Sequence, residues 1–177
     1  MNQCFSRGGV LMRIDLTEAN RTPGSVGRHV LEERMGPLEL GSEEVILPEP
    51  VRAELTVTGS EGMFWVEGGV AATGEFRCSR CLAPFRVPLS AELQEKYHPR
   101  GAAADLDAVF HHGDYVDVTR EVQKALLLVL PMKPVCRADC PGLCPTCGRD
   151  LNEGPCGCRD ETVDPRLAAL AGFFKDR

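Results

Sequence analysis

Residues 51–81 read VRAELTVTGSEGMFWVEGGVAATGEFRCSRC, and this stretch decides the predicted fold. The apolar residues at its start fall on one face of an alternating pattern: Val51, Ala53, Leu55 and Val57. Alternation at a period of two residues is typical of a strand with one buried face. SEG at 60–62 is a turn sequence, and 63–78 continue as a second strand with glycine interruptions. The stretch therefore predicts an antiparallel hairpin whose second strand leads into a C-x2-C pair.

The residues after this pair predict a further strand of the same sheet. LAPF at 82–85 forms the next turn, and FRVPLSAELQEKY at 85–97 continues as a strand. Together with the first two strands it forms an antiparallel meander of at least three long strands. We expect residues 98–114 to form a flexible, acidic loop.

Helical spacing replaces strand spacing in YVDVTREVQKALLLVL, residues 115–130. Asp117 or Thr119 is a candidate cap for the helix start. An apolar stripe follows that should pack on the sheet: Val122, Leu126, Val129 and Leu130. Prolines at 131 and 134 then end the helix.

The N-terminal third carries a weaker pattern. We expect residues 1–11 to be a disordered extension, and Met12, which opens the strand sequence MRIDL, is a candidate alternative start. Residues 21–50 contain many turn-forming residues and predict loops around one or two short elements. Within them, RHVLEERM at 28–35 is compatible with a short helix or a strand.

These patterns together predict an α+β protein with an antiparallel β-sheet and one packing helix. Residues 1–130 form the β-rich core with its helix, and residues 131–177 form a cysteine-rich, zinc-stapled arm. The arm ends in a short helix in DPRLAALAGFF, where Asp164 is the cap and Pro165 occupies the first helical position.

Nine cysteines dominate the chemistry of the chain, and six of them lie in CRADCPGLCPTCGRDLNEGPCGC, residues 136–158. Eight fall into close pairs: Cys78 and Cys81, Cys136 and Cys140, Cys144 and Cys147, Cys156 and Cys158. Cys4 stands alone. In a reducing compartment such pairs favour metal or free thiols over disulfides. Zinc prefers four thiolates in a closed structural site, so eight paired thiolates predict two structural zinc ions.

The cysteines can be grouped in more than one way. The favoured grouping closes one site from the last four cysteines, which lie within fifteen residues and have a low loop-closure cost. Cys78 and Cys81 then share the other ion with Cys136 and Cys140. In the alternative, Cys78 and Cys81 join Cys144 and Cys147, and the outer pairs share an ion.

A catalytic site is not indicated by any motif of the chain. The C-x2-C pair at 78–81 lies between strands, whereas a redox pair needs a βαβ context. His111 and His112 are the one close histidine pair, and we expect them to be loop residues rather than zinc ligands. A closed four-cysteine site has no open position for water. The chain is therefore expected not to be an enzyme and to have no small-molecule substrate.

Charge and hydropathy limit the partners and the compartment. The net charge of −6 makes the chain a poor non-specific phosphate binder. A local patch of Arg77, Arg80 and Arg86 around the first cysteine pair is a candidate surface for RNA or an acidic partner; the alternative is a set of solubilising side chains. We see no secretory signal, and the longest apolar run, ALLLVL, is too short to span a bilayer. We therefore expect a cytoplasmic protein with no membrane contact.

Several segments resemble the YceD family of large-ribosomal-RNA accumulation proteins. They are CSRCLAPF, LPMKPVC, DCPGLCPTCGRDLN, CGC and DPRLAALAGFF, in this order over residues 76–174. The resemblance implies a bacterial or plastid protein needed for normal levels of 23S ribosomal RNA, through its synthesis, processing, stability or assembly, with no enzymatic activity. On this basis we expect a non-enzymatic factor that binds pre-rRNA or an assembling large subunit. The alternatives are a metal-dependent RNA hydrolase and a protein-only adaptor that docks on a ribosomal protein.

Overall fold

The computed structural model describes residues 11–158, apart from 42, 61, 100–108 and 112. The elements run in the following order: β1 (Arg13–Asp15), α1 (Thr17–Arg21), β2 (Val26–Glu33), β3 (Leu38–Leu40), β4 (Glu43–Val45), β5 (Val51–Ser60), β6 (Met63–Arg77), β7 (Pro84–His98), β8 (Val109–Phe110), β9 (Tyr115–Asp117), α2 (Thr119–Leu128) and the 3-10 turn η1 (Leu151–Glu153). The fold class of the described residues is α+β, as the sequence predicts, with one substantial helix and two clusters of cysteines, one between the sheet and the C-terminal arm and one inside the arm.

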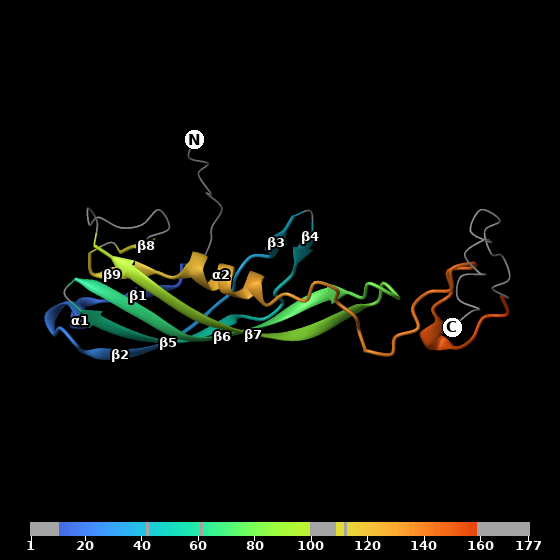
Figure 1. Cartoon of the computed structure of the whole chain (residues 1–177), viewed down its shortest axis with the longest axis horizontal. Coiled ribbons are helices and arrows are strands. Elements are labelled where there is room, and N and C mark those ends of the chain that lie inside the picture. Colours follow the sequence, from blue (N-terminus) through green and yellow to red (C-terminus); the bar gives the residue numbers. More distant parts are fainter. Residues whose placement is uncertain (1–10, 42, 61, 100–108, 112, 159–177) are drawn as a thin grey trace, which may run out of the picture.

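A five-stranded sheet in the order β2-β5-β6-β7-β8 forms the body of the molecule (Figure 1). Its strands pair antiparallel, except that the short β8 pairs parallel with β7. The meander predicted from residues 51–97 is confirmed as β5, β6 and β7. Val57 lies opposite Val66, and Val70 lies opposite Ala91, so the apolar faces of neighbouring strands coincide.

One face of the sheet is covered and the other is open to solvent. Figure 1 shows α2, the β1–β9 pair and the β3–β4 hairpin on the same side of the sheet. Their apolar side chains join those of the sheet in one core, whose largest fully buried members include Tyr97, Phe64, Met12, Ile14 and Leu126. The alternating burial of β5, in which every second residue is buried, follows from this one-sided covering.

The helix α2 follows the predicted pattern over most of its length. The helix cap is neither of the predicted residues but Val118, whose side chain makes no capping hydrogen bond; Asp117 instead accepts hydrogen bonds from the backbone N–H and the hydroxyl of Thr119. Val122 and Leu126 are fully buried, and Leu130 is partly buried against the core. Val129 does not belong to the buried stripe. It lies just after the last helical residue, Leu128, and is 39% exposed.

The region 21–50 is more regular than its turn-rich sequence suggests. RHVLEERM belongs mostly to the eight-residue strand β2, which pairs with β5 along its whole length. The hairpin β3–β4 lies beside α2 and β6, and the short helix α1 precedes β2. The strand expected at MRIDL is present as β1, which pairs with β9.

Some expectations fall outside the described residues. These are the disordered extension over residues 1–11, except Leu11, the middle of the acidic loop expected over residues 98–114, and the short helix in DPRLAALAGFF with its cap Asp164. The described ends of that loop are not all irregular, because β7 runs to His98 and Val109–Phe110 form β8. The boundary between core and arm at residue 130 stays a prediction. Within the part of the chain that is described, no helix combines the length and the apolar character needed to cross a membrane.

Candidate metal centres

The first cluster, called site 1 here, joins the sheet to the arm. Cys78 directly follows β6 and Cys81 lies in the turn before β7, whereas Cys136 and Cys140 lie in the segment after α2. The four sulfur atoms all lie within 4.8 Å of one another. Cys78, Cys81 and Cys140 are buried. Site 1 therefore brings together residues that are more than fifty positions apart in the sequence.

The sulfur spacing of site 1 matches a metal rather than a disulfide. The Sγ atoms of Cys78 and Cys140 are 3.9 Å apart, and those of Cys81 and Cys136 are 3.8 Å apart. Four sulfurs placed tetrahedrally at about 2.3 Å from a zinc ion would be separated by about 3.8 Å. A disulfide would require about 2.05 Å. The donor set and its spacing thus fit a tetrahedral thiolate site.

The second cluster, called site 2, lies wholly inside the arm. It contains Cys144, Cys147, Cys156 and Cys158, whose sulfur atoms also lie within 4.8 Å of one another. The turn η1 brings the chain back between its two pairs, and the N–H of Cys144 donates to the carbonyl of Arg149. The structure thus brings the cysteines together in the grouping that their spacing favours. Metal binding itself stays a prediction.

The first cysteine pair of each site, Cys78 and Cys81 in site 1 and Cys144 and Cys147 in site 2, forms a tight turn. The residue that follows each pair has a left-handed backbone conformation, with a positive φ. In site 2 this residue is Gly148 (φ 73°), whose N–H donates to the carbonyl of Cys144. In site 1 it is Leu82 (φ 62°), whose N–H donates to the carbonyl of Cys78. A leucine rarely adopts this conformation, so Leu82 is held there at some cost in backbone strain.

Backbone and side-chain donors stabilise the thiolate form of three cysteines. Burial alone would raise the pKa of Cys78, but the N–H groups of Cys136 and Arg80, each 3.4 Å from its sulfur, help to lower that pKa to about 6. The side-chain amide of Asn152 is the main cause that lowers the pKa of Cys140. The N–H of Cys147 is the main cause that lowers the pKa of Cys144 to about 6. Thiolates are the form that binds metal.

The two sites share a set of hydrogen bonds. Asn152, in η1 of site 2, places its Nδ2 atom 3.5 Å from the sulfur of Cys140 in site 1. The N–H of Leu151 donates to the carbonyl of Gly142, and the N–H of Leu143 donates to the carbonyl of Arg80. Sequence reasoning missed Asn152 as a functional residue. The one available signal was the Asp150-x-Asn152 spacing, because aspartates in turns accept hydrogen bonds two residues on, and Asp150 here accepts from the N–H of Asn152.

The three arginines of the predicted binding patch have different surroundings. Arg80 donates from its guanidinium to the carbonyls of Ala138 and Cys140, at 3.1 and 2.8 Å, and so ties the arm to the turn of site 1. Arg86 lies on the open face of the sheet beside Glu75 and Glu49, at 3.5 and 3.8 Å. Arg77 is exposed at the end of β6, and no carboxylate of the described residues pairs with it. A role of these residues in binding RNA stays a prediction.

His111 contacts two backbone carbonyls and an aromatic ring of the fold. Its two ring nitrogens lie 3.2 Å from the carbonyl of Gly113 and 3.1 Å from that of Gly62, and its ring packs edge-on against Phe64. His112 is outside the described residues. Within those residues, groups of three or more ligating side chains occur only in sites 1 and 2.

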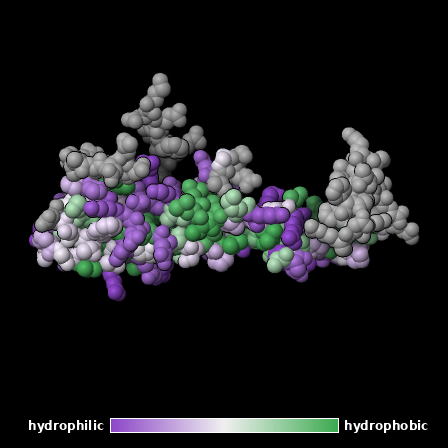
Figure 2. All heavy atoms as spheres, in the orientation of Figure 1, coloured by the Kyte–Doolittle hydropathy of each residue, from purple (hydrophilic) through white to green (hydrophobic). Residues whose placement is uncertain are grey.

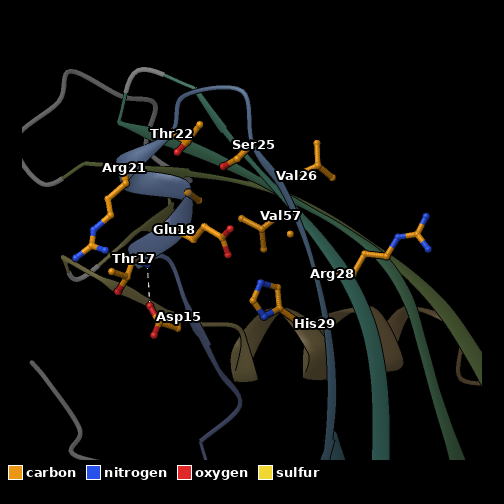
Figure 3. Close-up of a pocket in the computed structure, with 12 residues that line it drawn as sticks. Asp15, Thr17, Glu18, Arg21, Thr22, Ser25, Val26, Arg28, His29 and Val57 are labelled. Carbon is orange, nitrogen blue, oxygen red and sulfur yellow. Dashed lines mark hydrogen bonds between the residues drawn. The ribbon is translucent and has the colours of Figure 1, made fainter.

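An open pocket of about 630 Å³ lies at the other end of the sheet, between α1 and β2. Figure 3 shows Glu18 and His29 facing this pocket, whereas Arg21 and Arg28 point away from it. The nearby Asp15 accepts a hydrogen bond from Thr17, and bonds to Thr17 lower its pKa. The elements that line it, α1 and β2, lie at the end of the molecule opposite to the C-terminal arm (Figure 1).

An apolar surface lies next to site 1. Figure 2 shows hydrophobic side chains gathered over the end of α2 and the segment that follows it. There Leu128 and Met132 are 79% and 101% exposed. Met132 also lines an open groove of about 570 Å³, whose other walls include Ile46 of the bridge after β4, and Leu82. We call Ile46, Leu82, Leu128 and Met132 the apolar surface.

Comparison with known proteins gives a consistent assignment. Residues 66–174 match the model of the family described as "Large ribosomal RNA subunit accumulation protein YceD". An uncharacterised protein of Mycobacterium tuberculosis is 34% identical over 167 residues, which cover 90% of this chain and 79% of that protein. A similar protein of Mycobacterium leprae is 31% identical over 168 residues, covering 90% and 76%.

A plant protein connects these relatives to a named process. "Large ribosomal RNA subunit accumulation protein YCED homolog 1, chloroplastic", from Zea mays, is 24% identical over 159 residues, which cover 71% of this chain and 54% of that protein. No solved structure matches the chain. The family match spans both cysteine clusters and confirms the resemblance that the cysteine motifs indicate, and the chain therefore belongs to the YceD family.

Proposed function

We propose that this protein supports the accumulation of large-subunit (23S) ribosomal RNA as a cytoplasmic binding factor, not as an enzyme. It would bind pre-rRNA or an assembling large subunit. The family description and the name of the maize relative support the process. The observation that carries the non-enzymatic part of the proposal is the composition of the two clusters, each with four sulfur ligands.

Zinc is the metal that this donor set fits best. Zinc accepts four thiolates in tetrahedral geometry without any preference from d-electrons, and such sites are structural. A hydrolase would need an open coordination position for water, commonly beside histidine or carboxylate ligands. Four thiolates in each cluster leave no such position, and this argues against the alternative of a metal-dependent RNA hydrolase.

A protein-docking adaptor is the second candidate, and the apolar surface favours it. Leu128 and Met132 are almost fully exposed, and Leu82 keeps a strained backbone with a side chain that is 56% exposed. Strain of this kind persists where the surrounding structure or the function requires it. Exposed apolar side chains gathered beside a groove are typical of protein interaction sites. The partner would then be a ribosomal protein of the assembling subunit.

Crosslinking in cells, read out for both RNA and protein, tests these two candidates. The variant Leu82→Gly removes the exposed side chain. Glycine adopts the left-handed backbone conformation of this position without strain, so both metal sites should be retained. The variant Arg77→Glu changes the exposed arginine near site 1 and leaves the apolar surface intact.

The two variants give different expected results. Direct RNA binding predicts large-subunit rRNA crosslinks that weaken in Arg77→Glu and in high salt. Adaptor function predicts crosslinks to a ribosomal protein that weaken in Leu82→Gly and resist salt. Absence of both kinds of crosslink for the wild-type chain would contradict the proposed function.

A further inference from the structure

The strand β2 is an open edge of the sheet. It pairs with β5 through all eight of its residues, Val26–Glu33, and stands first in the sheet order, so its other side has no strand partner among the described residues (Figure 1). Val26 and Val30 point to the open face and are 64% and 61% exposed. An edge of this length presents a row of free backbone donors and acceptors to a second strand.

The opposite edge of the sheet, unlike β2, is protected from pairing with a further strand. There β7 carries Pro84 and Pro88, which lack the N–H group that pairing requires, and its end is covered by β8. The strand β2 contains no proline and no lysine, but it carries Arg28 and Glu32 on the open face and Glu33 on the other face, so it can pair only in a register that places opposite charges together. The sequence of β2 therefore leaves this edge competent to pair.

We propose that β2 pairs antiparallel with β2 of a second copy of this chain, so that two sheets join into one. A two-fold axis perpendicular to the sheet keeps each face on the same side, so a symmetric pairing must be centred on a single residue. Centring on Val30 places Arg28 opposite Glu32 of the second copy, and Glu32 opposite Arg28. All of these side chains belong to the open face of the sheet, because they alternate with the residues that face the core.

The charges of β2 select this register over its neighbours. Centring on His29 would place Arg28 opposite Val30 and leave its charge without a partner. Centring on Leu31 would place Arg28 opposite Arg34, which is repulsive. Centring on Val30 instead gives two opposite-charge pairs and brings the exposed Val30 side chains of the two copies together.

Arg28 and Glu32 are available for such pairs. Within the chain, Arg28 lies opposite Thr56 of β5, and Figure 3 shows its side chain directed away from the pocket beside α1. Glu32 lies opposite Arg52, whose guanidinium is held by Glu54 at 2.7 Å. The interface is small for a stable dimer, so we expect an association in the micromolar range.

Charge reversal gives a sharp test on the full-length, metal-loaded chain by sedimentation velocity between about 5 and about 500 µM. Wild type should shift from monomer to dimer within this range. Arg28→Glu and Glu32→Arg each replace two attractive pairs by two repulsive pairs, and each should weaken the dimer at least about tenfold. The doubly swapped variant, Arg28→Glu with Glu32→Arg, should dimerise like wild type.

A mixture of the two single variants is the decisive experiment. Arg28→Glu offers two acidic positions and Glu32→Arg offers two basic ones, so the two proteins should pair with each other although neither pairs with itself. Far-ultraviolet circular dichroism shows whether each variant is folded. A wild-type chain that stays monomeric throughout, or a dimer that neither reversal weakens, would overturn the proposal.

Discussion

Asn152 is the residue that connects the two clusters most directly. It belongs to the turn that closes site 2, yet its amide nitrogen lies 3.5 Å from the sulfur of Cys140 in site 1. Asp150 holds it in place by accepting from its side-chain amide at 2.6 Å. Donors to a ligand atom orient the ligand and stabilise its charge, and their loss commonly weakens metal binding about 10–100-fold.

We expect Asn152→Ala to weaken zinc binding at site 1 about tenfold while site 2 keeps its affinity. Competition with a chromophoric chelator measures the two affinities. Glu153→Ala, the exposed neighbour in the same turn, is the matched control and should change neither. Weakening confined to site 2 would show that Asn152 acts only inside its own turn.

Glu121 is a carboxylate in an unfavourable position. One of its oxygens and the hydroxyl of Tyr97 are buried and make no hydrogen bond of good geometry within the described residues, although the two side chains interact with each other. Burial raises the pKa of Glu121, and the nearby Glu95 raises it further. Burial is also the main cause that raises the pKa of Tyr97.

The raised pKa of Glu121 gives the chain a pH-dependent stability with a defined sign. The folded state favours the protonated carboxyl, so this stabilisation is complete below the ordinary pKa of 4.5 and is lost as the pH rises through the higher folded value. We expect Glu121→Gln to raise the melting temperature at pH 7–8 and to have little effect near pH 4. The solvent-facing Glu92→Gln should have no such effect. A variant that is less stable than wild type at pH 8 would contradict this assignment.

At the scale of elements, the long strands β6 and β7 determine where site 1 lies. Each has fifteen residues, which corresponds to about 50 Å at about 3.3 Å per residue. The helix α2 covers only part of this length, and the paired strands project beyond it to carry Cys78 and Cys81 towards the arm (Figure 1).

Two neighbouring glycines in β6 provide a test of how tightly its centre is packed. A Cβ atom on Gly68 (φ 153°) would collide with the carbonyl oxygen of Glu54 on β5, whereas one on Gly69 would meet no atom within 4 Å. We expect Gly68→Ala to lower the free energy of unfolding by about 2–4 kcal/mol. Gly69→Ala should change it by less than about 0.5 kcal/mol. Equal effects of the two substitutions in urea unfolding would contradict the close approach of β5 and β6.

The same elements show which features of the fold were readable from the sequence. The strands β5, β6 and β7 were predictable because their apolar residues alternate over long, uninterrupted stretches, and the cysteine pairs were predictable because their spacing is a chemical requirement. The strand β2 was ambiguous, since RHVLEERM has only two apolar side chains before Met35. The short β3 and β4 pair with each other but pack on α2 and β6, and β8 pairs with β7. These contacts, like the hydrogen bonds of Arg80 and Asn152, lie outside the local segment and cannot be predicted from it.

At the scale of the whole molecule, the two clusters have different structural roles. Site 1 spans the sheet and the arm, and the N–H of Ser79 reinforces that junction by donating to the carbonyl of Pro134 at 2.8 Å. Site 2 closes the arm upon itself. Because a closed thiolate site contributes its binding energy to folding, loss of each site should unfold a different part of the chain.

We expect Cys144→Ser to abolish site 2 and to remove hydrogen-exchange protection from residues 141–158, with the sheet unchanged. Cys78→Ser should abolish site 1 and release the arm from the sheet while site 2 stays closed. Each variant should bind one zinc ion where wild type binds two. Loss of both ions in Cys144→Ser would instead indicate that site 1 depends on site 2.

The central claim, that the chain contains two closed four-thiolate zinc sites, is tested most directly by zinc X-ray absorption combined with metal counting on protein purified under reducing conditions. We expect two zinc ions per chain, each with four sulfur neighbours at about 2.3 Å. A chain without zinc, with a single ion, or with nitrogen or oxygen in the first coordination shell would contradict it.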